Sequence, residues 1–279
     1  MTQSLASPAS VPSSSSLEQP SLEQTSLEQP SLAQQFVLMQ LADSFFPSGA
    51  YTLSHGLESL VQSGRIADAK GVEQFVQLLL CNKVGSTDLV ALAHAHTASV
   101  NMASANGALT ESSAGTAADD LSGSVSAIAA IDNRLYAQTP IEKTRIAQRQ
   151  SGRALLMVAG KTWPHPQLEA VSRQTAQGRM NCLHPVVFAV VAQVAGLSQQ
   201  AALVAFTHGF VTGLLGAAIR LGAIGHLDAQ QIRLSLAIDM ANICQRAPAI
   251  ALDDMWSCTP LIDIAQMQQA KLSRRLFSS

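Results

Sequence analysis

The stretch HPVVFAVVAQVAG, residues 184–196, followed by SQQAALVAFTHGFVTGLLGAAIRL, residues 198–221, decides the fold of this chain. No charged residue lies between Arg179 and Arg220. A proline near the start of the first run and a glycine at its end are typical helix start and stop signals. The two runs therefore predict a pair of consecutive, largely buried helices.

A stripe of small residues marks the second helix, because Gly209, Gly213 and Ala217 recur every four residues. Such a stripe lets another helix approach closely. The segment 201–219 approaches the roughly 20 apolar residues that span a membrane. It contains polar side chains, however, and no basic flank gives it an orientation. We therefore expect a buried helix of a protein without membrane segments, with a polytopic membrane protein as the alternative.

The rest of the chain also has helical patterns, because clean alternation of apolar and polar residues is missing. Thr139-Pro140-Ile141-Glu142 is a capping box that predicts a helix to about Ala159, with Gly160 as its stop. The other expected helices cover 35–43, 50–63, 69–84, 87–99, 198–221 with Ser198 as its cap, Asp228 to about Arg246 with Asp228 as its cap, and Thr259 to about Arg274. The prediction is an all-α fold, a single globular bundle of about nine or ten helices.

Two segments have a biased composition. Residues 1–34 repeat the pentad SLEQP or SLEQT three times and add a degenerate fourth copy at 31–34. A period of five places leucine on no single face of a helix or strand, so we expect a disordered tail. Residues 98–127 are rich in Ala, Ser and Gly and predict a long, flexible insert between two helices. The expected all-α domain is therefore residues 35–279, interrupted by this insert.

The overall composition excludes some classes of protein. The 279 residues include 17 Lys plus Arg against 19 Asp plus Glu, a formal net charge of -2. This balance lacks the basic excess of a nucleic-acid-binding protein. The four cysteines lie far apart and predict neither a disulfide framework nor a zinc ribbon. Together with the missing secretory signal, they predict a cytoplasmic protein.

No motif predicts self-sufficient catalysis. Gly160-Lys161-Thr162 imitates the end of a phosphate-binding loop, but Leu155 stands where that loop needs its first glycine. His94 and His96 lie two residues apart on a predicted helix, so their side chains point about 200° apart and do not chelate one ion together. The Ser, His and Asp residues of a catalytic triad in a known chain order and the HExxH motif of zinc proteases are also missing. We predict a protein that is not an enzyme and has no resident cofactor.

One weaker hypothesis concerns metal binding. In a symmetric dimer a single histidine or cysteine can pair with its counterpart around an ion. His226 and Cys244 are the weak candidates for such a site. The alternative function is accordingly a metal- or small-ligand-binding helical protein without a GTPase partner.

One segment is far more specific than these motifs: LMQLADSFFPSGAYTLSHGLE, residues 38–58. It resembles the N-terminal signature of the UreF family of urease accessory proteins. Residues 132–135, 142–145 and 152–156 are similar to the family's middle helices. Residues 184–189, 213 and 217–221 are similar to its central helix pair. Residues 259–263 and 275–277 are similar to its C-terminal tail. The resemblance covers about residues 35–279, apart from the insert.

The resemblance implies a function in urease maturation. UreF proteins are all-α homodimers that bind UreD (UreH in some organisms) and recruit the GTPase UreG, which they modulate. The assembly inserts nickel into apo-urease, and a transient nickel path through UreF into UreD has been proposed for the family. The resemblance therefore implies UreD/UreH, UreG and apo-urease as partners, and neither nucleic acid nor membrane.

Residue roles carry over by position. Tyr51 and Arg275 match a tyrosine and a tail arginine that are implicated in docking UreG. Tyrosine and arginine often dominate interface energies. Pro47 and Gly49 are expected to set the turn that directs Tyr51 outward. The remaining partner-binding candidates are Glu58, Leu276 and Phe277. Asp43 and His55, like Glu58, lie close to Tyr51 in the chain and are less favoured candidates.

The sequence also departs from the family pattern in two places. Many relatives have Met-Gln-His-Glu before the Arg-Leu-Phe of the tail, where this chain has Met267-Gln268-Gln269-Ala270. Ile224-Gly225-His226 stands where relatives often have Leu-Gly-Gln. A metal or charge role at positions 269–270 is therefore not expected here, whereas anchoring of the tail through Leu276 and Phe277 is.

Overall fold

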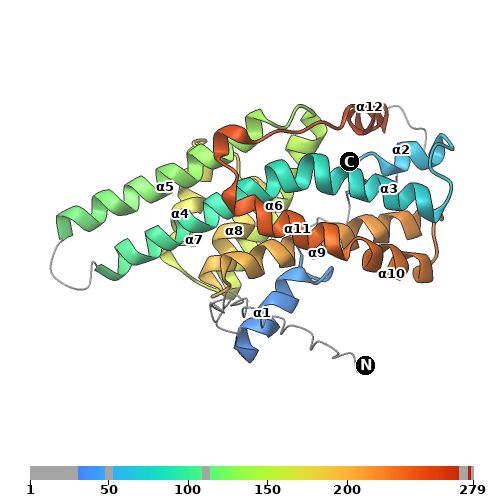
Figure 1. Ribbon diagram of the computed structural model, residues 1–279. Coiled ribbons are helices and arrows are strands. Elements are labelled where there is room, and N and C mark those ends of the chain that lie inside the picture. Colours follow the sequence, from blue (N-terminus) through green and yellow to red (C-terminus); the bar gives the residue numbers. More distant parts are fainter. Residues whose placement is uncertain (1–30, 48–52, 109–113, 270–275, 278–279) are drawn as a thin grey trace, which may run out of the picture. The chain divides into compact units, whose positions relative to one another are not determined.

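Figure 1 shows the computed structural model of the chain, which describes residues 31–47, 53–108, 114–269, 276 and 277. The described residues form α-helices and short helical turns and contain no β-strand. In chain order the helices are α1 (Leu32–Ala42), α2 (Leu57–Gln62), α3 (Ala69–Leu79), η2 (Leu80–Asp88), α4 (Leu89–Ala108), α5 (Ala114–Ala137), α6 (Glu142–Thr162), α7 (Pro166–Ala176), α8 (His184–Val194), α9 (Gln199–Arg220), α10 (His226–Ser235), α11 (Ala237–Arg246), η3 (Ala247–Ala249), η4 (Leu252–Asp254) and α12 (Pro260–Gln268). The predicted all-α class is confirmed.

The predicted central helix pair is confirmed as α8 and α9. Residues 185–192 of α8 are buried without exception, and α8 packs against α4, α6 and α9. A helix that is apolar all round is expected in the core of a protein. The oxygen of Ser198 accepts a hydrogen bond from the Ala201 N–H, which confirms the predicted N-cap of α9. The helix ends at Arg220, and Gly222 follows with a positive φ of 72°.

Three other predicted helix boundaries are wrong: the side chains expected to cap α6 and α10 have other roles, and α6 does not stop at Gly160. Thr139 does not cap α6, since its hydroxyl donates back to the carbonyl of Leu135. Gly160 lies inside α6, which continues to Thr162. Asp228 is the third residue of α10, and its carboxylate accepts from the Gly225 N–H.

The number and limits of the helices differ from the prediction in several places. The single helix expected from 228 to 246 is two helices, α10 and α11, which meet at Leu236. Helix α7 was not predicted. The described part of the chain begins at Ser31, whose side chain and that of Gln34 form a capping box for α1, so the fourth pentad belongs to the helical domain. Residues 1–30 lie outside the described residues.

The Ala/Ser/Gly-rich segment lies between two helices, as predicted, but much of it is helical. Helices α4 and α5 extend into it and run side by side (Figure 1). Alanine has the highest helix propensity of all residues, which offsets the cost of the glycines. Residues 109–113 lie outside the described part of the chain.

Two helical stretches are long and apolar enough to cross a membrane by length and composition alone, Ala69–Met102 and Gln199–Arg220. In the first, 78% of the most apolar window is buried inside the protein, and in the second 56%. Burial of this kind is what a core helix shows, and it supports the interpretation of α9 as part of a helical core.

Candidate functional site

A buried carboxylate, Glu58, holds the end of the chain. Its side chain is fully buried in the first turn of α2. Oε1 accepts from the Leu276 N–H at 2.6 Å, and Oε2 accepts from Nε2 of Gln269 at 3.0 Å. Nε2 of Gln62 donates to Oε1 at 3.3 Å. A buried carboxylate is tolerated only when hydrogen bonds replace its hydration, and here those bonds come from the C-terminal segment.

The last described residues point in opposite directions. The Phe277 side chain is 5% exposed, and the guanidinium of Arg220 lies 4.5 Å from the centre of its ring. Nε2 of Gln269 also donates to the Phe277 carbonyl at 3.5 Å. Leu276, in contrast, is 68% exposed. The buried phenylalanine therefore anchors the segment, while the neighbouring leucine is presented to the outside.

Helix α12 brings the tail to Glu58 by packing closely on α2. Gly56 has a φ of 89°, and a Cβ atom there would lie 3.1 Å from the Gln266 nitrogen and 3.2 Å from the Ile262 carbonyl oxygen. Only glycine combines this backbone conformation with so close an approach. The Thr144 hydroxyl of α6 donates to the side-chain oxygen of Gln266, which fixes α12 from a second side.

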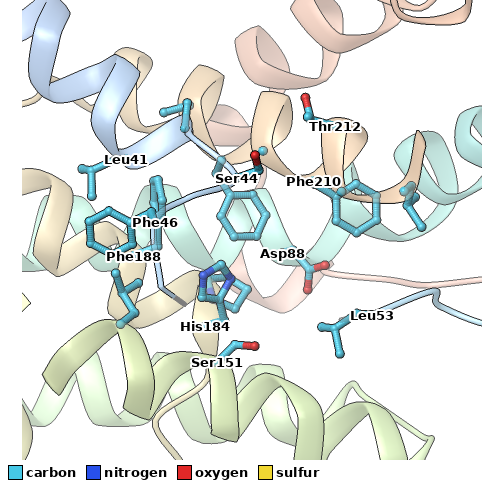
Figure 2. Close-up of a pocket in the computed structure, with 18 of the residues that line it drawn as sticks. Leu41, Ser44, Phe46, Leu53, Asp88, Ser151, His184, Phe188, Phe210 and Thr212 are labelled. Carbon is cyan, nitrogen blue, oxygen red and sulfur yellow. The ribbon is translucent and has the colours of Figure 1, made fainter. Parts of the chain in front are cut away.

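An apolar cavity of about 90 Å³ lies beside this region, between α1, α6, α8 and α9. Figure 2 shows Phe46, Phe188, Phe210, His184 and Asp88 around it. The rings of Phe188 and Phe206 contact the His184 imidazole at 5.9 and 5.5 Å between centres. Burial lowers the pKa of His184 to about 4, so its imidazole is neutral at pH 7.

This shift predicts acid sensitivity. The unfolded chain protonates His184 below pH 6.5 and the folded chain does not, so this histidine lowers the stability as the pH falls from 6.5 toward 4. We expect His184→Phe to remove about 1–2 kcal/mol of the stability loss between pH 6.5 and 5. Urea denaturation at several pH values measures it, with His226→Phe as an exposed-histidine control. Equal pH slopes for the two variants would contradict the assignment.

The structure places some of the predicted site residues and not others. Tyr51, Gly49 and Arg275 lie outside the described residues, so their docking roles stay predictions. Pro47 is exposed and is the last described residue before 48–52. Glu58, Leu276 and Phe277 come together although 218 residues separate the first two. Of the less favoured residues, Asp43 is exposed and its carboxylate accepts from the Phe45 N–H at 2.9 Å, whereas His55 contacts the ring of Phe210.

Sequence reasoning missed the role of Gln269. Gln269 is 1% exposed, and its side-chain amide donates to Glu58. No local signal identifies this contact, because it depends on how α12 folds back over α2. Among the predicted partner-binding residues, Glu58 is directed inward, which gives it an anchoring position.

The candidate metal residues lie apart from this site. His226 is exposed at the first position of α10, whereas Cys244 is 1% exposed and its sulfur lies 3.3 Å from the Thr207 hydroxyl oxygen. Across the described ranges, no group of three or more His, Cys, Asp or Glu side chains is placed to hold a metal ion. His94 and His96 contact different carbonyls, those of Ile250 and Leu197, as their spacing predicts.

The described residues thus form an all-helical domain in which Glu58 holds the end of the C-terminal segment and Leu276 is exposed. The family model described as UreF matches residues 66–237. The urease accessory protein UreF of Trichodesmium erythraeum is 46% identical over 245 residues, 88% of this chain and 97% of that one. The protein of the same name from Yersinia enterocolitica is 30% identical over 242 residues, 87% of this chain and 96% of its own.

The chain therefore belongs to the UreF family of urease accessory proteins, which places it in urease maturation. The match spans nearly the full length of these relatives, and it confirms the resemblance that the segment 38–58 indicates.

Proposed function

We propose that this protein is a scaffold that binds UreD (UreH) and recruits the GTPase UreG, whose activity it modulates while nickel is inserted into apo-urease. Nickel is the cargo of this assembly, passing transiently, and the protein is not itself an enzyme. We place it in the cytoplasm as a homodimer that binds neither nucleic acid nor membrane. The observation that carries the proposal is the anchored tail, which holds Leu276 exposed beside Arg275.

Exposed apolar side chains support a protein with several partners. Monomeric proteins rarely expose such groups together, and clusters of them mark interaction surfaces. On α1 the exposed fractions are 74% for Leu32, 71% for Phe36 and 62% for Met39, at helical spacing. Two further groups lie on α10 with α11 and on α12: Leu227, Leu234 and Ile238, and Leu261, Ile264 and Met267. Three separate surfaces suit an assembly of a second copy, UreD and UreG.

The proposal is tested with purified protein, UreD and UreG. Tyr51→Ala and Arg275→Ala should leave the circular dichroism and the melting temperature unchanged. Each should raise the dissociation constant for UreG about thirtyfold or more, the factor that corresponds to 2 kcal/mol at an interface hot spot, and so reduce co-elution with UreG. Arg65→Ala, at an exposed arginine after α2, serves as the control. Normal co-elution of both docking variants would overturn the assigned site.

Isothermal titration calorimetry with nickel distinguishes this proposal from the alternative, which is a metal- or small-ligand-binding protein without a GTPase partner. Stoichiometric nickel binding by the purified protein that is lost in His226→Ala, without any association with UreG, would favour it. The present proposal predicts association with UreG whether or not nickel is added.

A further inference from the structure

Segment η2 is a π-helix that joins α3 to α4. The N–H of Leu89 bonds to the carbonyl of Val84, the spacing of five residues that defines this geometry. Within the segment, Nζ of Lys83 lies 2.5 Å from Oδ2 of Asp88, and the two side chains are only 9% and 3% exposed. In an α-helix residues five apart point about 140° away from each other. The ion pair therefore exists because the segment is π-helical, and it is expected to stabilise that geometry over the α-helical one.

A contribution to the stability of the fold does not by itself explain why the Lys83–Asp88 ion pair is buried. Taking two charges out of water costs much of what their attraction returns, and apolar residues often serve a core equally well. In addition, Oδ1 of Asp88 has no hydrogen-bond partner among the described residues. In some proteins a buried ionic group selects one geometry of the chain over another.

The π-helical segment holds the chain that leads into α12. The Trp256 N–H bonds to the Ser86 carbonyl at 3.4 Å, and the Ser86 hydroxyl donates to the Trp256 carbonyl at 2.6 Å. The Cys258 N–H bonds to the Asn82 carbonyl at 3.0 Å. The residues immediately before α12 are thus attached to two positions of η2, four residues apart.

Lys83 also acts on the elements on either side of the ion pair. Its positive charge, after burial, contributes to lowering the pKa of His55 to about 3, in the turn that precedes α2. On α12 the same charge opposes the rise that burial imposes on the pKa of Asp263. The charge of Lys83 therefore acts on a residue of the segment 38–58 and on a residue of α12, besides its partner in η2.

We propose that η2 positions the C-terminal arm, residues 256–269, through the Lys83–Asp88 pair: the pair keeps the segment π-helical, and the π-helical turns set the place of residues 256 and 258, directly before α12. Its consequence for UreG recruitment rests on the proposed function, because the arm ends at Gln269, which bonds to the same Glu58 carboxylate as Leu276. Lys83 and Asp88 are positioning residues, since both are buried.

The double variant Lys83→Met/Asp88→Asn tests this, because it removes both charges with little change in shape. Hydrogen exchange, read by mass spectrometry on peptides that contain Trp256 and Cys258, is expected to be about tenfold faster than in the natural protein. Peptides from α8 should keep their protection. A folded double variant whose arm exchanges at the natural rate would overturn the proposal, because the pair would then be a structural element only.

The charge-reversed variant Lys83→Asp/Asp88→Lys provides the rescue test and covers the case in which the first variant unfolds. It keeps an ion pair five residues apart, so the arm should regain its slow exchange. An arm that exchanges fast in this folded variant would contradict the proposal. Because exchange is measured without partners, it is independent of UreG: a loosened arm with normal co-elution would overturn only the proposed docking role of the tail.

Discussion

We expect Glu58→Ala to release the C-terminal segment and, under the proposed function, to abolish stable co-elution with UreG, although Glu58 itself is buried. The substitution removes the carboxylate that accepts from the Leu276 N–H and from the side-chain amides of Gln269 and Gln62. Because part of this region is exposed to water, we expect a stability loss of about 2 kcal/mol, within the range for lost buried hydrogen-bond acceptors. Limited trypsin digestion should cleave at Arg274 or Arg275 much faster, and size-exclusion chromatography measures the loss of UreG.

Two matched variants sharpen this prediction. Glu58→Gln keeps one acceptor oxygen, so the tail should be released only in part. Glu169→Ala removes an exposed carboxylate on α7 and should behave as the natural protein. If Glu58→Ala folds and still binds UreG with unchanged affinity, the anchored tail is not part of the docking site.

Gly152→Ala should destabilise the protein more than any other single methyl group added to α6. A Cβ atom at this position would lie 2.0 Å from the carbonyl oxygen of Cys182. That carbonyl is not free to move, since Cys182 has a φ of 66° and the N–H groups of residues 181–183 all bond to the Asp132 carboxylate. We expect a loss of about 3 kcal/mol or more, typical of severe overpacking in a core.

Gly160→Ala on the same helix is the matched control. No heavy atom lies within 4 Å of a Cβ atom there, so the change should stabilise α6 by about 0.5–1 kcal/mol. Urea denaturation followed by circular dichroism at 222 nm measures both variants. Similar stabilities for the two would contradict the close approach of α6 to the loop before α8.

A helix could be predicted where a local sequence signal alone determines where it begins and ends. The charge-free interval with Ser198 and the following glycines defines α8 and α9, because capping and burial act within a few residues of one another. Thr139 has an equally good local signal and fails, since the same hydroxyl also satisfies the preceding helix by bonding to Leu135. The π-helical turns at 80–88 have no sequence signal of their own, because their ion pair has the wrong spacing for an α-helix.

The candidate site was predictable only through resemblance. The segment 38–58 identifies the family, but nothing in it shows that Glu58 faces the interior or that Leu276 bonds to it. That contact joins residues 218 positions apart and depends on α12 packing over Gly56. Nothing in the sequence indicated a role for Gln269 in the tail, yet its amide takes part in the anchor, because a neutral donor suffices for a buried carboxylate.

The role in urease maturation is tested most directly by the nickel content of urease purified from a urease-producing cell in which the gene for this protein is deleted. We predict urease with little nickel, restored to the normal content by the natural protein and not by Glu58→Ala. Fully nickel-loaded urease from the deletion strain, at ordinary nickel concentrations, would contradict the account.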